Sequence, residues 1–185
     1  MSEPNYPPPY GFGLSKIKGW AGRFIALGQL LAGRPSKWQH AFLVLPGNLV
    51  IEAEPGGARV VPIDEYWNGT GWDAEFIYPP LTPEQRDNFV GVAMGYKGIP
   101  YGFLDYFSLL LLHLHIRLPF VKNFVLHSQT AICSQLVDGA YKTLGVMLFD
   151  DDRFPGDVMP SDLDWLAKHH PEWAVYKYKT NLEAR

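Results

Sequence analysis

Cysteine is nearly absent from this chain: Cys133 is the only one in 185 residues. A single thiol excludes an internal disulfide framework, because a disulfide needs two cysteines within one chain. It also means that any zinc site would have to depend on histidines and carboxylates. Two interpretations of Cys133 follow: it is a small core residue, or it is a reactive group.

Dense basic tracts and a secretory leader are also lacking. The net charge is −3 and the pI is near 6.0, so nucleic acid is not an expected partner. Residues 1–13 show no basic segment followed by an apolar one, which argues against a signal peptide. We therefore expect a cytoplasmic protein, of bacterial or phage origin.

No uninterrupted apolar run is long enough to predict a transmembrane helix. The most apolar stretch, about 103–120, has only four consecutive leucines and contains Asp105 and Arg117. We interpret it as a helical insertion that packs in the core or lies against lipid or a partner.

The hydrophobic content of 47% and the charged content of 19% predict one folded domain over residues 1–185. An extended arm rich in Pro and Gly, about 1–13, is followed by a predicted amphipathic helix over 14–33. Apolar runs between Pro-Gly turns predict strands at about 38–45, 49–54, 58–63 and 74–78, and a closing strand near 173–178. Further helices are predicted after Thr82, over about 131–144, and after a Ser161 cap. This pattern indicates an α+β fold.

Cys133 lies in the first turn of the predicted helix 131–144, on its apolar face. One interpretation is a core cysteine on a hydrophobic stripe. The other is a nucleophile, because the first turn of a helix favours the thiolate and offers free N–H groups to an oxyanion.

A thiolate nucleophile needs a base, and His40 is the best placed of the six histidines. It begins an apolar strand, and Glu52 lies in the next strand of the same predicted hairpin, where it can reach the imidazole across the ladder. The alternative is a solvent-facing Glu52 beside a strand-end histidine. His113 and His115 are too poorly supported by other ligands to predict a metal site, and we expect no metal and no cofactor.

Several motifs together resemble a known family. "GIPYGF" followed by "ICSQLV" is similar to the paired signature of the NlpC/P60 superfamily of papain-like thiol hydrolases, and "QHAFLVL…VIEAE" is similar to its histidine strand and the strand after it. Because His40 and Glu52 precede Cys133, the order resembles the circularly permuted branch, which includes the YiiX/YaeF-like enzymes. The resemblance implies a papain-like fold, with a central antiparallel sheet or partial barrel packed against the helix that carries Cys133.

The same resemblance implies roles for individual residues. Cys133 would be the nucleophile, His40 the general base and Glu52 the residue that orients His40. Tyr101 and Ser134 would contact the substrate or its oxyanion.

Three functions follow as hypotheses. The first is a cysteine hydrolase of an amide bond, in a peptide or a peptidoglycan stem peptide. The second is a thiol acyltransferase, esterase or thioesterase acting on lipid or acyl substrates, with a peripheral membrane contact through 103–120. The third is a non-catalytic binding module on a hydrolase fold. The oligomeric state is left open.

Overall fold

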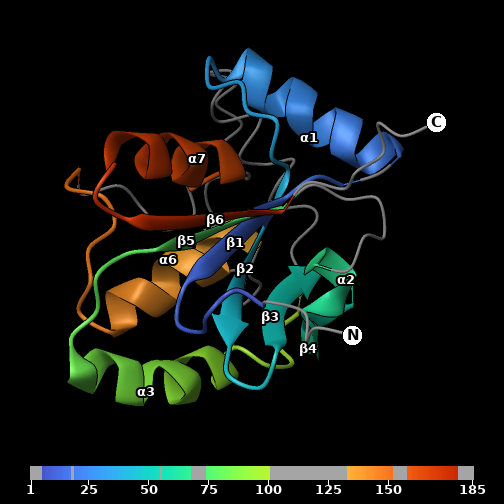
Figure 1. Ribbon diagram of the computed structural model, residues 1–185. Coiled ribbons are helices and arrows are strands. Elements are labelled where there is room, and N and C mark those ends of the chain that lie inside the picture. Colours follow the sequence, from blue (N-terminus) through green and yellow to red (C-terminus); the bar gives the residue numbers. More distant parts are fainter. Residues whose placement is uncertain are drawn as a thin grey trace, which may run out of the picture.

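The computed structural model describes residues 6–17, 19–54, 56–67, 74–100, 133–151 and 158–178. Figure 1 shows a central sheet with helices around it. In chain order the elements are β1 (Phe12–Ser15), α1 (Trp20–Leu31), β2 (His40–Leu45), β3 (Leu49–Glu54), β4 (Gly57–Pro62), α2 (Asp64–Trp67), β5 (Ala74–Tyr78), α3 (Pro83–Met94), α6 (Cys133–Thr143), α7 (Pro160–His169) and β6 (Ala174–Tyr178).

The sheet has six strands in the order β4-β3-β2-β1-β5-β6, and every neighbouring pair is antiparallel. The predicted α+β class and the central antiparallel sheet are confirmed. The sheet is open, with β4 and β6 at its edges. The described strands therefore form the predicted antiparallel sheet and not the alternative, a partial barrel.

The hairpin of β2 and β3 follows the predicted pattern closely. Gly47 and Asn48 both have positive φ, at 77° and 59°, in the turn after Pro46. This turn pairs Leu45 with Leu49 and Phe42 with Glu52. The other predicted strands are found within one or two residues of their expected ends, and β5 matches its prediction at both ends.

The N-terminal region differs from the prediction. Phe12–Ser15 form β1, which lies between β2 and β5 in the middle of the sheet. The extended arm therefore ends before Phe12, and the helix begins at Trp20 instead of residue 14. A strand of four residues is too short to show a clear alternation in sequence, and its partners β2 and β5 are distant along the chain.

Two predicted helix caps have different outcomes. Thr82 caps α3 as expected: its side chain accepts from the Gln85 amide, and the Gln85 side chain accepts from the Thr82 amide. Ser161 does not cap α7, because that helix begins at Pro160 and its N-cap residue is Met159. The Asp162 carboxylate instead accepts from the Met159 amide at 2.8 Å.

The two faces of the sheet carry different layers (Figure 1). Helices α3, α6 and α7 pack on the face that presents Ala41, Leu43 and Ile51. The opposite face carries Phe42 and a smaller apolar cluster, which includes Tyr66 of the short helix α2. The sheet therefore lies between the apolar residues of α6, such as Leu136 and Val137, and the residues around Phe42.

None of the helices in the described part of the chain is long and apolar enough to cross a membrane. The predicted insertion at 103–120 lies outside the described residues.

Candidate active site

His40 and Glu52 meet on the sheet as their positions in the hairpin predict. Glu52 lies opposite Phe42, and His40 is two residues before Phe42, so both side chains point to the same face. His40 Nε2 lies 2.8 Å from Glu52 Oε2. His40 is 3% exposed and Glu52 is fully buried, so the solvent-facing alternative for Glu52 is wrong.

Cys133 completes the arrangement from the other layer. It is the first residue of α6 and is 4% exposed, and its side chain lies close enough to His40 to raise the pKa of the imidazole. Because Nε2 is engaged with Glu52, Nδ1 is the ring nitrogen left for the sulfur. Cys133 and His40 are each the first residue of their element, so the two chain segments meet where β2 and α6 begin.

Ser134 and Tyr101 complete the predicted set of site residues. The Ser134 hydroxyl is buried and donates to the Val158 carbonyl at 2.5 Å, so its side chain fastens α6 to the segment before α7. The Ser134 side chain is thus engaged with Val158, and any contact of Ser134 with a substrate oxyanion would have to come from its backbone N–H. Tyr101 lies outside the described residues.

Two further residues hold Glu52, and neither was predicted from the sequence. Arg59 is directly opposite Glu52 on β4 and donates to Oε1 from Nε at 3.0 Å and from Nη2 at 2.8 Å. The Tyr66 hydroxyl donates to Oε2. The pairing of Glu52 with Arg59 could have been predicted, because the two residues have opposite charges and flank a glycine turn of a hairpin. No pattern in the sequence predicts the contact of Tyr66 with Glu52.

The surroundings shift the pKa values of this group strongly. Burial alone would lower the pKa of His40, but hydrogen bonds with Cys133 and Glu52 raise it to about 10. Burial alone would raise the pKa of Glu52, but hydrogen bonds from His40 and Tyr66 lower it below 4.5. Burial and the Glu52 charge raise the pKa of Tyr66, so it stays a donor. His40 is therefore cationic and Glu52 anionic at neutral pH.

Aromatic packing holds these groups in place. The Phe42 ring stacks on Tyr66 with ring centroids 4.2 Å apart, and it covers Gly13 of β1 so closely that a Cβ there would lie 2.1 Å from the ring. His40 also stacks on Tyr66, with centroids 6.2 Å apart. Gly13 thus makes room for the ring that positions Tyr66, and Tyr66 in turn positions Glu52.

One set of described residues brings three metal-ligand atoms together. Atoms of His40, Glu52 and Glu54 lie within 4.8 Å of one another. The Arg59 guanidinium already donates to both carboxylates, at 2.8 Å from Glu52 and 2.7 Å from Glu54. A metal ion would have to displace that cation, so we assign the cluster to ion pairing.

Replacing Tyr66 by phenylalanine tests how much its hydroxyl stabilises the Glu52 carboxylate. We expect Tyr66→Phe to lower the free energy of unfolding by about 1–3 kcal/mol, because a buried carboxylate loses a donor. The pKa of Glu52 should rise, since one of the hydrogen bonds that lower it is gone. A carboxylate with a lowered pKa adds stability above pH 4.5 that is lost as the pH falls through the folded-state pKa. Urea denaturation across this range should show acid destabilisation beginning at a higher pH.

Tyr78→Phe is the matched control. Its hydroxyl donates to the Pro8 carbonyl at an exposed position, so its removal should leave the acid dependence unchanged. Equal acid dependence in wild type and Tyr66→Phe would contradict the assigned role of Tyr66.

The chain was also compared with known proteins. No model of a known protein family matches it, and no curated protein matches it either. The functional assignment therefore depends on the geometry of Cys133, His40 and Glu52.

Proposed function

We propose that this protein is a cysteine hydrolase that cleaves an amide bond in a peptide or a peptidoglycan stem peptide. The observation that carries the proposal is the position of His40, whose Nε2 lies 2.8 Å from Glu52 Oε2 and whose pKa is raised by the neighbouring Cys133 side chain. A nucleophile, a base and a residue that orients the base are the elements of a thiol hydrolase. The permuted NlpC/P60 relationship and its papain-like fold belong to the same proposal, and the antiparallel sheet with α6 packed against it supports them.

The reaction would proceed through an acyl-enzyme. The Cys133 thiolate attacks the amide carbonyl, and N–H groups in the first turn of α6 bind the oxyanion. The C–N bond breaks as the His40 imidazolium protonates the departing amine, which leaves a thioester on Cys133. Water then attacks the thioester as neutral His40 takes its proton. The C–S bond breaks, the acid departs, and the thiolate and imidazolium are restored.

The charge of His40 favours an amide over an ester. An amine leaves only after protonation, and a histidine whose pKa is raised to about 10 carries that proton at neutral pH. An alcohol or thiol leaving group needs the proton less. The second candidate, acyl transfer or hydrolysis of an acyl ester or thioester, uses the same acyl-enzyme and is separated from the first by assaying both substrate classes.

The pH dependence of Cys133 alkylation tests the proposal without a known substrate. Since this is the only cysteine, iodoacetamide labelling reports on one site. We expect the wild-type rate to be nearly constant from about pH 6 to 8, as the proposed thiolate–imidazolium pair requires. In His40→Asn the rate should rise about tenfold per pH unit, as it does for an ordinary thiol with a pKa near 8.5. The rate is measured by mass spectrometry, with circular dichroism to verify folding.

The slope of this profile does not depend on how easily the reagent reaches a buried thiol. A wild-type profile that rises like that of an ordinary thiol would overturn the proposal and favour a non-catalytic module. The same conclusion would follow if folded His40→Asn kept the flat wild-type profile.

A further inference from the structure

Helix α1 presents its leucines to solvent. Leu27, Leu30 and Leu31 are 52%, 58% and 52% exposed. Their spacing of three and four places them on one face of the helix, which in a surface helix is ordinarily the face packed against the core. The buried face of the same helix carries Ile25 and the polar Gln29. This is the reverse of an ordinary surface helix, which buries its leucines and exposes its polar residues.

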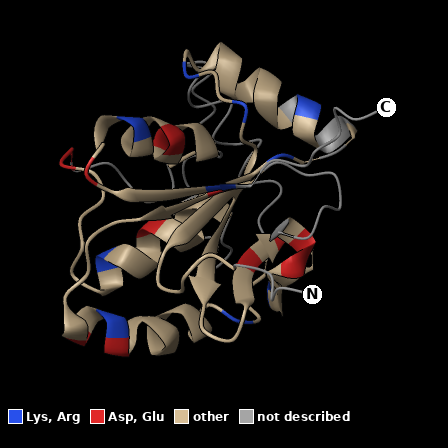
Figure 2. Ribbon diagram, viewed as in Figure 1, with Lys and Arg blue, Asp and Glu red and all other residues tan. Residues whose placement is uncertain are grey.

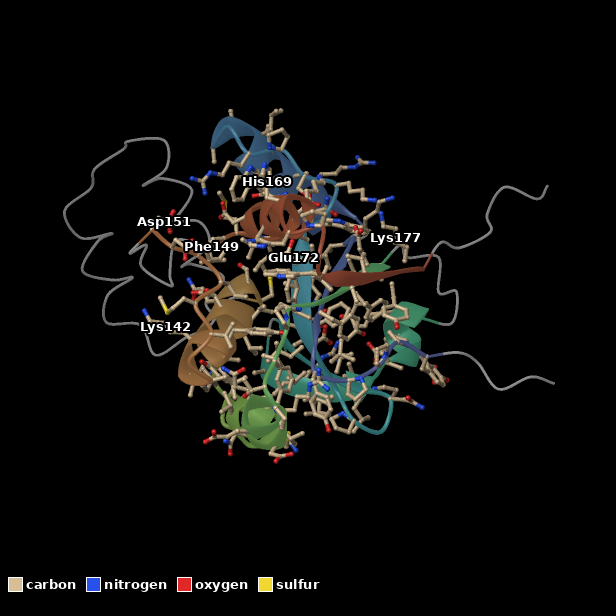
Figure 3. All side chains as sticks on the ribbon, turned by 60° about the vertical axis from the view of Figure 1, so that its left-hand side comes forward. Lys142, Phe149, Asp151, His169, Glu172 and Lys177 are labelled. Atoms are coloured by element: carbon tan, nitrogen blue, oxygen red, sulfur yellow. The ribbon has the colours of Figure 1, made fainter. Side chains whose placement is uncertain are left out.

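Specific hydrogen bonds hold α1 in this orientation. Gln29 is fully buried; its Nε2 donates to the Trp38 carbonyl at 2.9 Å, and its Oε1 accepts from the Ser161 amide at 2.9 Å. These bonds join α1 to the segment before β2 and to the first turn of α7. Figure 3 shows α1 packed beside α7 at the end of the molecule where His169 lies, well apart from Lys142 in that view. The outward leucines are thus a fixed feature of the surface.

The charged residues of α1 and of the segments next to it in sequence have one sign. Residues 4–51 contain five basic residues and no Asp or Glu, whereas the whole chain has a net charge of −3. In Figure 2 the described part of α1 and the loop after it carry blue segments and no red ones. Arg23 is exposed one helical turn before Leu27, and Lys37 is exposed beyond the end of the helix. Arg34 is paired with the buried Asp162. Arg23 and Lys37, whose Nζ lies 4.3 Å from the centre of the Trp38 ring, are the other exposed basic residues on this side among those the structure describes.

We propose that α1 docks on the surface of an anionic lipid bilayer, with Leu27, Leu30 and Leu31 in the boundary between headgroups and acyl chains. A leucine stripe beside basic side chains is the pattern by which a helix lies in the plane of a membrane. Anionic headgroups attract the Lys and Arg side chains next to it. A second copy of this chain is a poorer occupant, because a two-fold contact would bring two basic helices together. The docking is independent of the thiol chemistry.

Flotation of the full chain with lipid vesicles tests the proposal. We expect the wild type to bind phosphatidylcholine vesicles that contain about 30 mol% phosphatidylserine, and to bind pure phosphatidylcholine at least about tenfold more weakly. The triple variant Leu27→Gln, Leu30→Gln, Leu31→Gln should lose at least about tenfold in affinity while remaining folded, because these side chains are already exposed. Arg23→Gln with Lys37→Gln should weaken binding to the anionic vesicles and reduce its sensitivity to salt.

Val90→Gln with Met94→Gln is the matched control. These apolar residues on α3 are 36% and 38% exposed, so their replacement should leave vesicle binding unchanged. Cys133→Ala should also bind like the wild type, which separates this proposal from the proposed reaction. Residues 103–120 are intact in the triple variant, so vesicle binding retained by it would overturn the assignment to α1. The proposal would also be overturned if the wild type did not bind the vesicles. A triple variant that lost self-association but kept vesicle binding would show instead that the leucines contact a second copy of the chain.

Discussion

Cys133→Ala is expected to reduce amide hydrolysis by about 10³-fold or more, because no other group in the chain can form the thioester intermediate. The protein itself should remain folded. Cys133 is small and buried, so its loss should cost about 1 kcal/mol of unfolding free energy. The measurement is the initial rate on a panel of peptide amides and peptidoglycan stem peptides, together with urea denaturation of both proteins.

Two further variants make this result specific. Cys133→Ser keeps the size of the side chain and its ability to hydrogen-bond His40, and it should be almost as inactive, since a serine hydroxyl beside a cationic His40 is not ionised. Thr143→Ala removes an exposed hydrogen bond at the far end of α6 and should retain full activity. If Cys133→Ala kept its rate on every substrate that the wild type cleaves, Cys133 would not be the nucleophile.

Glu52→Gln is the second change with a large expected effect. The carboxylate is fully buried and accepts from His40, Arg59 and Tyr66, so an amide of the same shape leaves donors unpaired. Breaking a buried ion pair in this way should lower the free energy of unfolding by about 3 kcal/mol. Activity should fall by about 10²-fold or more, because His40 loses the group that orients it. The pKa of His40 should fall from about 10, which titration of its ring protons by NMR would show.

The pH dependence of stability provides an independent measurement on the same pair. A histidine whose pKa is raised contributes stability fully below pH 6.5, and this is lost as the pH rises through about 10. A carboxylate with a lowered pKa contributes stability above pH 4.5, and this is lost as the pH falls through the folded-state value. The wild type should therefore weaken at both ends of the range, and Glu52→Gln should show a smaller change at each end.

Glu54→Gln is the control for Glu52→Gln. Glu54 accepts from the same guanidinium at 2.7 Å, but its side chain is 39% exposed, so its replacement should cost about 1 kcal/mol or less. A Glu52→Gln variant as stable and as active as Glu54→Gln would show that the buried carboxylate neither supports the fold nor orients His40.

Local patterns in the amino-acid sequence determined much of the fold. The Pro-Gly turn after Leu45 and the alternation of β2 and β3 placed His40 and Glu52 on one face, and the capping box at Thr82 located the start of α3. These features depend on residues close together in sequence, whose turn and cap chemistry is visible in the amino-acid order.

Tertiary structure alone decided the rest. The insertion of Phe12–Ser15 between β2 and β5 and the hydrogen bond from Tyr66 to Glu52 depend on how separate elements pack, which no local spacing encodes. The outward orientation of the α1 leucines likewise follows from the hydrogen bonds of Gln29 to Trp38 and Ser161. By itself the sequence determined that Cys133 lies in the first turn of a helix and that His40 and Glu52 share a hairpin. The folded sheet and α6 decided that the thiol meets the imidazole, because only packing brings together groups so distant along the chain.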